Sequence, residues 1–202
     1  TFKNKSTVNY YDYSILSFYP TKILSCYGDG GALILNKNKN FKANLLKNNG
    51  HGTKDKENCK VLGVNSRLDS IQAFILNEKL KKIDSKIKDR KINNKILDNI
   101  SHAFLKKPIF NKNLISNGYI YSIYVNLNKR NAFIKYMNKN KIQCVVYYKK
   151  LLSKNHILKP LIKTDLTNAL KCSKSLICLP NHNDLNKNQV TKISEIVTKF
   201  TK

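Results

Sequence analysis

The sequence predicts a mixed α/β protein, and three observations lead to this fold class. Two short apolar stretches flank a glycine-rich segment near the start of the 202-residue chain. A long stretch with helical spacing of apolar residues follows, and the last part of the chain alternates strand-like and helix-like patterns. We therefore expect two lobes of mixed structure joined by a long helix.

Residues 11–35 have the pattern of a strand, a tight loop and a second strand. The apolar stretches are residues 13–16 and 32–35, and Gly28, Gly30 and Gly31 lie between them. Three glycines within four residues indicate either a turn with positive φ or a close approach of two backbone segments. The loop presents one lysine, Lys22, just after Pro20.

Lys22 has two interpretations. In a chain rich in lysine, any one of them is most simply a solvated surface charge. A lysine held on a loop beside strand ends can instead lose its solvation, and its neutral amine can then attack a carbonyl group to form a Schiff base. The hydroxyl of Ser17, five residues upstream, lies near the same loop.

Helical patterns occupy the middle of the chain. Residues 37–48 form an amphipathic pattern with Phe41, Leu45 and Leu46 on one side, and Asn48-Asn49-Gly50 ends it. After a polar, irregular stretch at 50–62, apolar residues keep helical spacing from about residue 65 onward. We expect one helix that runs to about residue 104, before Pro108, and connects the two lobes.

The last part of the chain predicts a small α+β unit of three strands and two helices. The strands are expected at 119–127, 142–148 and 175–180, and the helices at 129–140 and 186–200. Asn186 is the expected N-cap of the last helix. Residues 149–171 are expected to form a loop with some helix.

The net charge of +26 suggests nucleic-acid binding at first sight, but its composition favours another cause. Only three arginines occur, and lysine, asparagine and isoleucine rise together, as A+T-rich coding DNA produces. The positive charge is spread along the chain, and base readout favours arginine. We therefore do not expect nucleic acid to be the partner, although a basic nucleic-acid binder stays an alternative.

Cysteine and histidine spacing predicts neither a disulfide framework nor a metal site. The five cysteines include no C-x-x-C pair, and the four histidines have no metal-ligand spacing. Free thiols in a reducing cytoplasm are the simplest account. No apolar run approaches the ~20 residues needed to span a bilayer, so we expect no membrane association. Because the chain begins at Thr1, we expect it to be part of a longer protein.

Two segments together resemble the DegT/DnrJ/EryC1/StrS sugar aminotransferase family. SFYPTKILSCYGDGGALI (17–34) is similar to the cofactor-lysine segment of this family, and GVNSRLDSIQAFILNEKL (63–80) to its second signature. YSIYVNL (121–127), IQCVVYY (142–148) and SLICLPNHNDLNKNQVTKI (175–193) resemble its small domain. The branch that aminates UDP-2-acetamido-2-deoxy-3-oxo-glucuronate is the nearest one suggested.

The resemblance implies the C-terminal part of a fold-type I, pyridoxal-phosphate-dependent transferase. Residues 1–62 would end the large domain and its sheet, 63–107 would form the connecting helix, and 108–202 the small α+β domain. It further implies a cytoplasmic homodimer with shared active sites. Its substrates would be glutamate and a nucleotide-linked sugar, for surface polysaccharide such as lipopolysaccharide O-antigen.

The resemblance also assigns roles to residues. Lys22 would bind the cofactor covalently and move the proton during transfer. Ser17 would bind the cofactor phosphate, as would Asn65 from the partner subunit. Arg67 would face a substrate carboxylate. From the residues alone, Asn65 could instead be a helix N-cap and Arg67 a member of a surface ion pair.

Tyr147 and Tyr148 stand where the related branch carries His-Tyr-Pro. Tyr148 matches this motif, whereas Tyr147 and Lys149 depart from it. The resemblance implies that the two tyrosines bind substrate. The alternative is that both are strand residues that pack within the small lobe.

The resemblance covers only the second half of the family's length, and the carboxylate that faces the pyridine nitrogen belongs to the first half. We therefore expect this chain alone not to transaminate. Within the family, dehydrating relatives replace the lysine with histidine, so Lys22 favours a transferase. The alternative of a different class is a non-catalytic or regulatory relative that keeps the fold.

Overall fold

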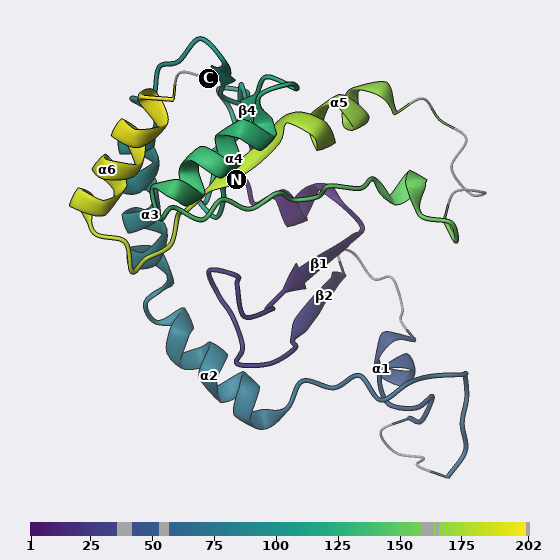
Figure 1. The fold of residues 1–202 in the computed structure, drawn as a ribbon. Helices are drawn as coiled ribbons and strands as arrows, with labels where there is room; N and C mark the ends of the chain where they lie inside the picture. The colour runs from purple at the N-terminus through teal and green to yellow at the C-terminus, as the bar shows by residue number, and fades with distance from the viewer. Residues whose placement is uncertain (36–41, 53–56, 159–163, 165, 201–202) are drawn as a thin grey trace. The chain divides into compact units, whose positions relative to one another are not determined.

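The computed structural model describes residues 1–35, 42–52, 57–158, 164 and 166–200, which form two compact units (Figure 1). Unit 1 comprises Thr1–Asp84 with Asn113–Ile115, and unit 2 comprises Ser85–Lys112 with Ser116–Lys202. This division follows packing and passes through the expected connecting segment 63–107. The three-segment scheme from the sequence therefore stays a prediction.

Unit 1 contains a two-stranded antiparallel sheet, as the strand-loop-strand pattern predicts. A short 3-10 helix, η1 (Thr7–Tyr10), precedes strand β1 (Tyr13–Ser17), which pairs with β2 (Gly31–Leu35). The register pairs Tyr13 with Leu35 at one end and Ser17 with Gly31 at the other. The loop between the strands therefore begins at the end of β1 that carries Ser17.

The first predicted helix is short in the structure. Helix α1 covers Ala43–Leu46, and residues 36–41 lie outside the described residues. The backbone N–H of Gly50 donates to the carbonyl of Leu45 at 2.8 Å, and Gly50 has a φ of +83°. A glycine with positive φ just after a helix is the usual termination signal, which agrees with the predicted stop at Asn48-Asn49-Gly50.

The predicted long helix is two helices, α2 (Ser70–Leu80) and α3 (Ile83–Leu97). At the interruption the N–H of Lys82 donates to the carbonyl of Lys79, three residues back, so the chain tightens into a turn. Similar i→i−3 bonds after Leu97 end α3 before the expected residue 104. The prediction of one continuous helix was wrong because apolar spacing continues across a turn that the backbone makes with local bonds.

Unit 2 contains a three-stranded antiparallel sheet of order β3-β4-β5. Its elements are β3 (Leu105–Lys106), β4 (Tyr121–Val125), α4 (Arg130–Lys139), η2 (Leu152–Lys154), α5 (Thr167–Ser175), β5 (Leu176–Leu179) and α6 (Lys187–Thr198). The predicted strands at 119–127 and 175–180 and both predicted helices are confirmed. The predicted strand at 142–148 was wrong, because this segment makes only one isolated bridge, Val145 with Cys178. The short β3 takes the third place.

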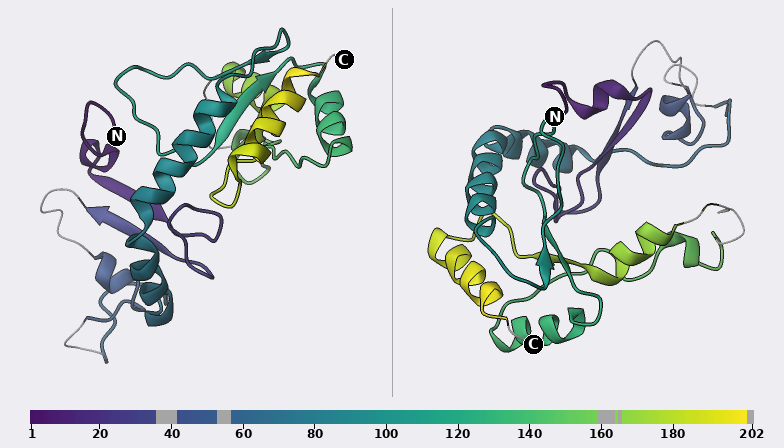
Figure 2. Two further views of the ribbon diagram at one scale, coloured as in Figure 1. Left: turned by 90° about the vertical axis from the view of Figure 1, so that its left-hand side faces the viewer. Right: turned by 90° about the horizontal axis from the view of Figure 1, so that it is seen from above.

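The core of unit 2 lies between its sheet and helices α3, α4 and α6 (Figure 2). Residues of β4 alternate between buried and half-buried, which is the period of a strand with one covered face. The covered face meets a cluster of buried side chains from all three helices, including Leu97, Phe133, Met137, Val190 and Val197. Asn186 caps α6 as predicted: its side chain accepts from the N–H of Gln189, and Gln189 returns a bond to the N–H of Asn186.

Candidate functional site

The loop between β1 and β2 is closed by backbone hydrogen bonds and presents Lys22. The N–H of Phe18 donates to the carbonyl of Gly30 at 2.8 Å, and the N–H of Cys26 donates to the carbonyl of Phe18 at 2.8 Å. Within this frame the N–H of Lys22 donates to the carbonyl of Tyr19 at 2.9 Å, so Lys22 lies on a tight turn. The Lys22 side chain is half-buried.

The glycines of the loop allow close approach rather than positive φ. A Cβ on Gly30 would lie 2.5 Å from the sulfur of Cys26, and one on Gly31 would lie 2.9 Å from the carbonyl oxygen of Leu16. Neither glycine has a positive φ. Of the two explanations that the sequence left open, close packing of the loop on itself is therefore the one that holds.

Helix α2 holds the far side of this loop by two polar side chains. The side-chain oxygen of Gln72 accepts from the N–H of Tyr27 at 2.8 Å. The amine of Lys79 donates to the carbonyl of Ser25 at 2.7 Å and to its hydroxyl at 3.1 Å, and it lies 4.1 Å from the centre of the Tyr27 ring. Such a contact with an aromatic face is a cation–π interaction. The loop is therefore held at its base by backbone bonds and at residues 25–27 by side chains of α2.

Sequence reasoning assigned no role to Gln72 and Lys79. The signal that could have found them is their spacing of seven residues, which places two polar groups on one face of α2. Ser70, Asn77 and Glu78 of α2 are polar as well, so polarity alone does not mark this pair. This spacing names no bonding partner, because the backbone groups that the two side chains bind lie 45 and 54 residues away in the chain. We call Gln72 and Lys79 the clamp of α2.

Ser17 lies at the end of β1, opposite Gly31 in the register, and is exposed. Its hydroxyl accepts from the N–H of Tyr19 at 3.4 Å. The strand end thus brings the hydroxyl of Ser17 to the start of the loop that carries Lys22. These two predicted residues belong to one structural element.

Asn65 and Arg67 contact each other. The Nε of Arg67 donates to the side-chain oxygen of Asn65 at 3.0 Å, and both residues are exposed. The N-cap position of α2 is Asp69, so the alternative interpretation of Asn65 as the N-cap was wrong. Since the partner of Arg67 in this contact is an amide, the contact is no ion pair either.

Backbone bonds to the segment after α1 position Asn65. The N–H of Val64 donates to the carbonyl of Leu46 at 2.8 Å, and that of Ser66 donates to the carbonyl of Lys47 at 2.9 Å. Asn65 itself forms an isolated bridge with Asn48. The residue is therefore held on a short ladder within unit 1, which we call the 46–66 ladder.

Tyr147 and Tyr148 belong to unit 2 and lie in a turn. Their rings are 5.4 Å apart at an angle of 64°, and the peptide bond between them is cis. Tyr147 is 38% exposed and Tyr148 is 74% exposed. The alternative that both are strand residues packed in the small lobe was therefore wrong.

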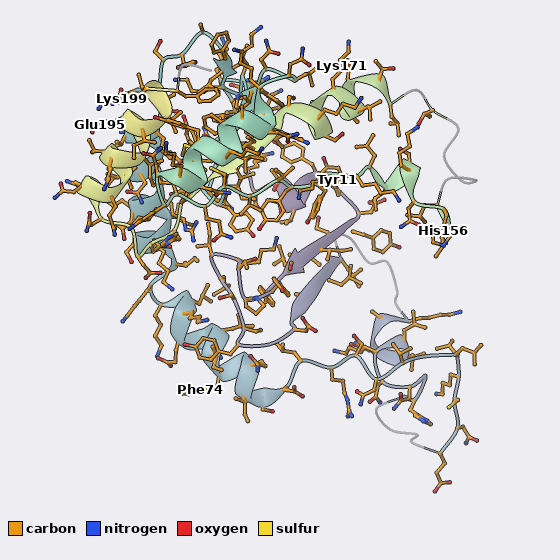
Figure 3. All side chains as sticks on the ribbon, in the orientation of Figure 1. Tyr11, Phe74, His156, Lys171, Glu195 and Lys199 are labelled. Atoms are coloured by element: carbon orange, nitrogen blue, oxygen red, sulfur yellow. The ribbon has the colours of Figure 1, made fainter. Side chains whose placement is uncertain are left out.

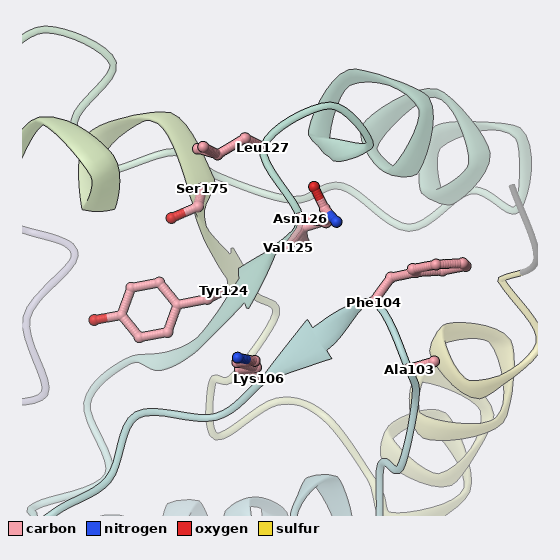
Figure 4. Close-up of a pocket in the computed structure, with 8 residues that line it drawn as sticks. All are labelled: Ala103, Phe104, Lys106, Tyr124, Val125, Asn126, Leu127 and Ser175. Carbon is pink, nitrogen blue, oxygen red and sulfur yellow. The ribbon is translucent and has the colours of Figure 1, made fainter.

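Two hollows lie within the units. In unit 2 a pocket of about 290 Å³ is lined by residues of β3, β4 and the end of α5, among them Phe104, Lys106 and Tyr124 (Figure 4). The hydroxyls of Tyr124 and Ser175 point to the same side there. In unit 1 a groove of about 770 Å³ is lined mainly by apolar side chains, including Ile15, Leu33, Leu46, Val64 and Leu68. Lys22, Ser17, Asn65 and Arg67 line neither hollow.

The described residues hold neither a metal-binding cluster nor a helix that could cross a bilayer. In that part of the chain, no group of three or more histidine, cysteine, aspartate or glutamate side chains could hold a metal ion. In the same part of the chain, every helix is too short or too polar to cross a bilayer.

In this mixed α/β chain, the loop between β1 and β2 thus presents the half-buried Lys22. The chain belongs to the DegT/DnrJ/EryC1/StrS aminotransferase family, whose model matches residues 1–198. The fold class expected from the sequence and the resemblance to this family are thereby confirmed. Pyridoxal phosphate is the cofactor of this family, and its solved structures include a pyridoxal phosphate form.

Two relatives of this chain carry names of different kinds, one regulatory and one enzymatic. A "pleiotropic regulatory protein" of Geobacillus stearothermophilus is 29% identical over 192 residues, which are 91% of this chain and 50% of that protein. UDP-2-acetamido-2-deoxy-3-oxo-D-glucuronate aminotransferase of Pseudomonas aeruginosa is 38% identical over 87 residues, 43% of this chain and 24% of that enzyme.

Solved structures extend the likeness to the fold. A DegT/DnrJ/EryC1/StrS aminotransferase from Brucella abortus has a TM-score of 0.79 and 27% identity, and the match covers 92% of this chain and 50% of that one. The chain thus spans about half the length of the first relatives it matches.

Proposed function

We propose that the protein is a pyridoxal-phosphate-dependent aminotransferase that moves an amino group from glutamate to a keto group of a nucleotide-linked sugar. One observation carries this proposal: a half-buried Lys22 on a loop that its own backbone closes, in a chain of the sugar aminotransferase family. The name of the Pseudomonas aeruginosa relative supports a UDP-linked 3-oxo uronic acid as the sugar.

The residues present fit the cofactor. An aldehyde needs an amine, which Lys22 supplies. A phosphate needs hydrogen-bond donors, which the hydroxyl of Ser17 and, from the partner subunit, the amide of Asn65 supply. The close approach at Gly30 and Gly31 keeps the loop beside the end of β1 that carries Ser17. When bound, pyridoxal phosphate supplies an electron sink for the carbon that loses its proton.

The side chains of this chain divide the remaining work. The Nζ of Lys22 moves the proton between the α-carbon of the substrate and C4′ of the cofactor. Arg67 presents a fork of donors that suits the carboxylate of glutamate or of a uronic acid, and its contact with Asn65 orients that fork. We assign substrate binding to Tyr147 and Tyr148, which are both exposed residues.

Gln72 and Lys79 are positioning residues in this proposal. Neither needs to touch substrate, because their bonds hold residues 25–27 of the loop that carries Lys22. The proposal further places the full-length protein in the cytoplasm as a homodimer with shared sites, in the synthesis of surface polysaccharide such as lipopolysaccharide. The 202-residue chain alone is expected to be inactive.

Reductive trapping tests the central assignment. The full-length protein is incubated with pyridoxal phosphate, reduced with borohydride and digested, and the modified peptide is identified by mass spectrometry. We expect the label on Lys22, its loss in Lys22→Arg and its retention in Lys5→Arg, an exposed lysine of the same unit. A label that stays in Lys22→Arg, or no label on Lys22 in the native protein, would refute the assignment.

A transfer assay tests the substrates. Glutamate and a UDP-linked 3-oxo uronic acid are supplied, and the amino sugar is detected by mass. Formation of the amino sugar by the native protein but not by Lys22→Arg is the expected result. A native protein that is labelled at Lys22 yet aminates no nucleotide-linked keto sugar would contradict the substrate class alone.

A regulatory role is the second candidate, because a relative that matches 91% of this chain carries a regulatory name. In that case the fold and cofactor binding persist without turnover. Trapping at Lys22 without amino transfer from any donor to any sugar nucleotide would favour it. Salt-dependent binding of DNA that maps to one face would instead favour a nucleic-acid binder.

A further inference from the structure

An exposed cysteine and a histidine form a pair in unit 1, near the 46–66 ladder. The sulfur of Cys59 lies 3.5 Å from Nε2 and 3.7 Å from Nδ1 of His51. The same sulfur lies 3.4 Å from the carbonyl oxygen of Asn49, to which the thiol can donate. Cys59 is exposed and His51 is half-buried. Neither residue has a role in the proposed amino transfer.

The backbone builds this pair. His51 and Cys59 face each other in an isolated antiparallel bridge. Beside it, the N–H of Lys60 donates to the carbonyl of Gly50 at 2.9 Å, and the N–H of His51 donates to the carbonyl of Asn48 at 2.9 Å. Gly50 has a φ of +83°, and a Cβ there would lie 1.8 Å from the carbonyl oxygen of Val61. The two backbone segments are therefore held too close at Gly50 for any residue but glycine, and the bridge places His51 and Cys59 opposite each other.

The other cysteines have different surroundings. Cys26 and Cys178 are buried. Burial raises the pKa of Cys144 to about 12, with a smaller contribution from Cys178. Cys172 contacts the hydroxyl of Tyr124 at 4.0 Å. Of the five cysteines, Cys59 alone is exposed.

We infer that Cys59 is a modification site, at which His51 takes the thiol proton and the thiolate attacks a low-molecular-weight disulfide. The thiolate, rather than the thiol, is the nucleophile, and a neighbouring imidazolium stabilises it. The attack forms a bond between the Cys59 sulfur and one sulfur of the disulfide, whose S–S bond breaks. The other sulfur leaves as a thiolate and takes up the proton that His51 received.

Charge favours an anionic partner for this step. The chain has a net charge of +26, so a disulfide that carries carboxylates, such as glutathione disulfide, is drawn to the surface. The product is a mixed disulfide that a free thiol reverses. The reactivity of Cys59 does not depend on whether the protein transfers amino groups.

The test compares the five cysteines within the full-length protein. Glutathione disulfide is added at about neutral pH, and the modification of each cysteine peptide is followed by mass spectrometry in folded and in denatured protein. We expect Cys59 to react about 10-fold faster in the folded protein than in the denatured chain, and the other four to react more slowly when folded. A Cys59 that reacts no faster folded than denatured would overturn the inference, since exposure alone gives no acceleration.

Two histidine variants separate the imidazole from simple access. His51→Gln should lose most of the acceleration, about 10-fold, whereas His156→Gln, which changes an exposed histidine of unit 2, should keep it. Equal rates in both variants would refute the role of His51. Reversal of the adduct by a free thiol and its absence in Cys59→Ser identify the bond as a mixed disulfide at this sulfur.

Discussion

The two units differ in where they put their apolar side chains. In unit 2 they form a single buried cluster that includes Ile123, Phe133 and Ile177, each with no exposed surface. In the described part of unit 1, the buried apolar side chains are Cys26 and Leu76. Ile15 is 83% exposed, and Phe74, which Figure 3 labels on α2, is 66% exposed. Most of the buried core thus lies in unit 2, whereas the proposed catalytic residue Lys22 belongs to unit 1, which has less core.

The difference teaches how each unit holds its shape. Burial of apolar surface gives about 25 cal/mol per Å², so unit 2 is stabilised mainly by packing. Unit 1 depends instead on polar contacts to backbone groups, from Gln72, from Lys79 and along the 46–66 ladder. The net contribution of such bonds is about 1 kcal/mol each. Substitutions should therefore have different effects in the two units.

The largest effect is expected from a core phenylalanine of unit 2. Phe133→Ala should lower the free energy of unfolding by about 3–5 kcal/mol, because it leaves a cavity in a closely packed cluster. Phe74→Ala, which removes the same side chain from the surface of α2, should change it by less than about 0.5 kcal/mol. Urea unfolding measures both, and equal losses would break the comparison.

A buried arginine of unit 2 gives the next test. Arg90 donates to the side chain of Asn183 and to the carbonyls of Tyr119 and Asn181. Arg90→Met leaves these acceptors without a donor and should cost about 1–3 kcal/mol of unfolding free energy. Arg67→Met, at an exposed position of unit 1, should leave stability unchanged while it reduces amino transfer. An equal loss of unfolding free energy in both variants would contradict this difference between the two units.

The clamp of α2 is expected to affect activity more than stability. Lys79→Met removes the bonds to Ser25 and should lower kcat/KM of the full-length protein about 10- to 100-fold, because a small displacement of the Lys22 loop misplaces the amine. Lys81→Met, which loses only an exposed pair with Glu78, serves as the control. If Lys79→Met keeps full kcat/KM, the clamp has no positioning role.

The smallest effect concerns alkaline pH. Burial raises the pKa of Cys144 from 9.0 to about 12, so the folded state binds this proton more tightly than the unfolded state. The resulting stability is complete below about pH 9 and is lost as the pH rises toward 12. Between pH 9 and pH 10 the native protein should lose about 1 kcal/mol more than Cys144→Ala in urea unfolding. Parallel losses in both would disprove this link.

Much of the fold follows from the sequence where a segment has one dominant signal. The strands around 13–16, 32–35, 121–125 and 176–179 and the helix after Asn186 combine apolar period with clear caps or turns. The prediction of a strand at 142–148 failed because residues that favour strands do not specify a pairing partner. The strand that pairs with β4 on the edge away from β5 is the two-residue β3, which has no recognisable sequence pattern. The turn at Lys81 and Lys82 was missed because no proline or glycine marks it.

The candidate site was predictable only in part. Lys22 and Ser17 lie on the loop and strand end where the local pattern puts them. The contact between Arg67 and Asn65 was not predictable, because the sequence around Asn65 is equally compatible with a helix N-cap. Gln72 and Lys79 could not be assigned, since their partners are backbone groups 45 and 54 residues away in the chain. Contacts of that range depend on tertiary packing rather than local pattern.

The turn after Lys79 has a consequence for how this protein can move. Helix α2 ends at Leu80, and the boundary between the units follows at Asp84 and Ser85. Gln72 and Lys79, which hold the loop, therefore belong to the same unit as the amine of Lys22. Flexing at Lys81 and Lys82 would carry lysine, loop and clamp along together, so the reactive group keeps its local surroundings through such a motion.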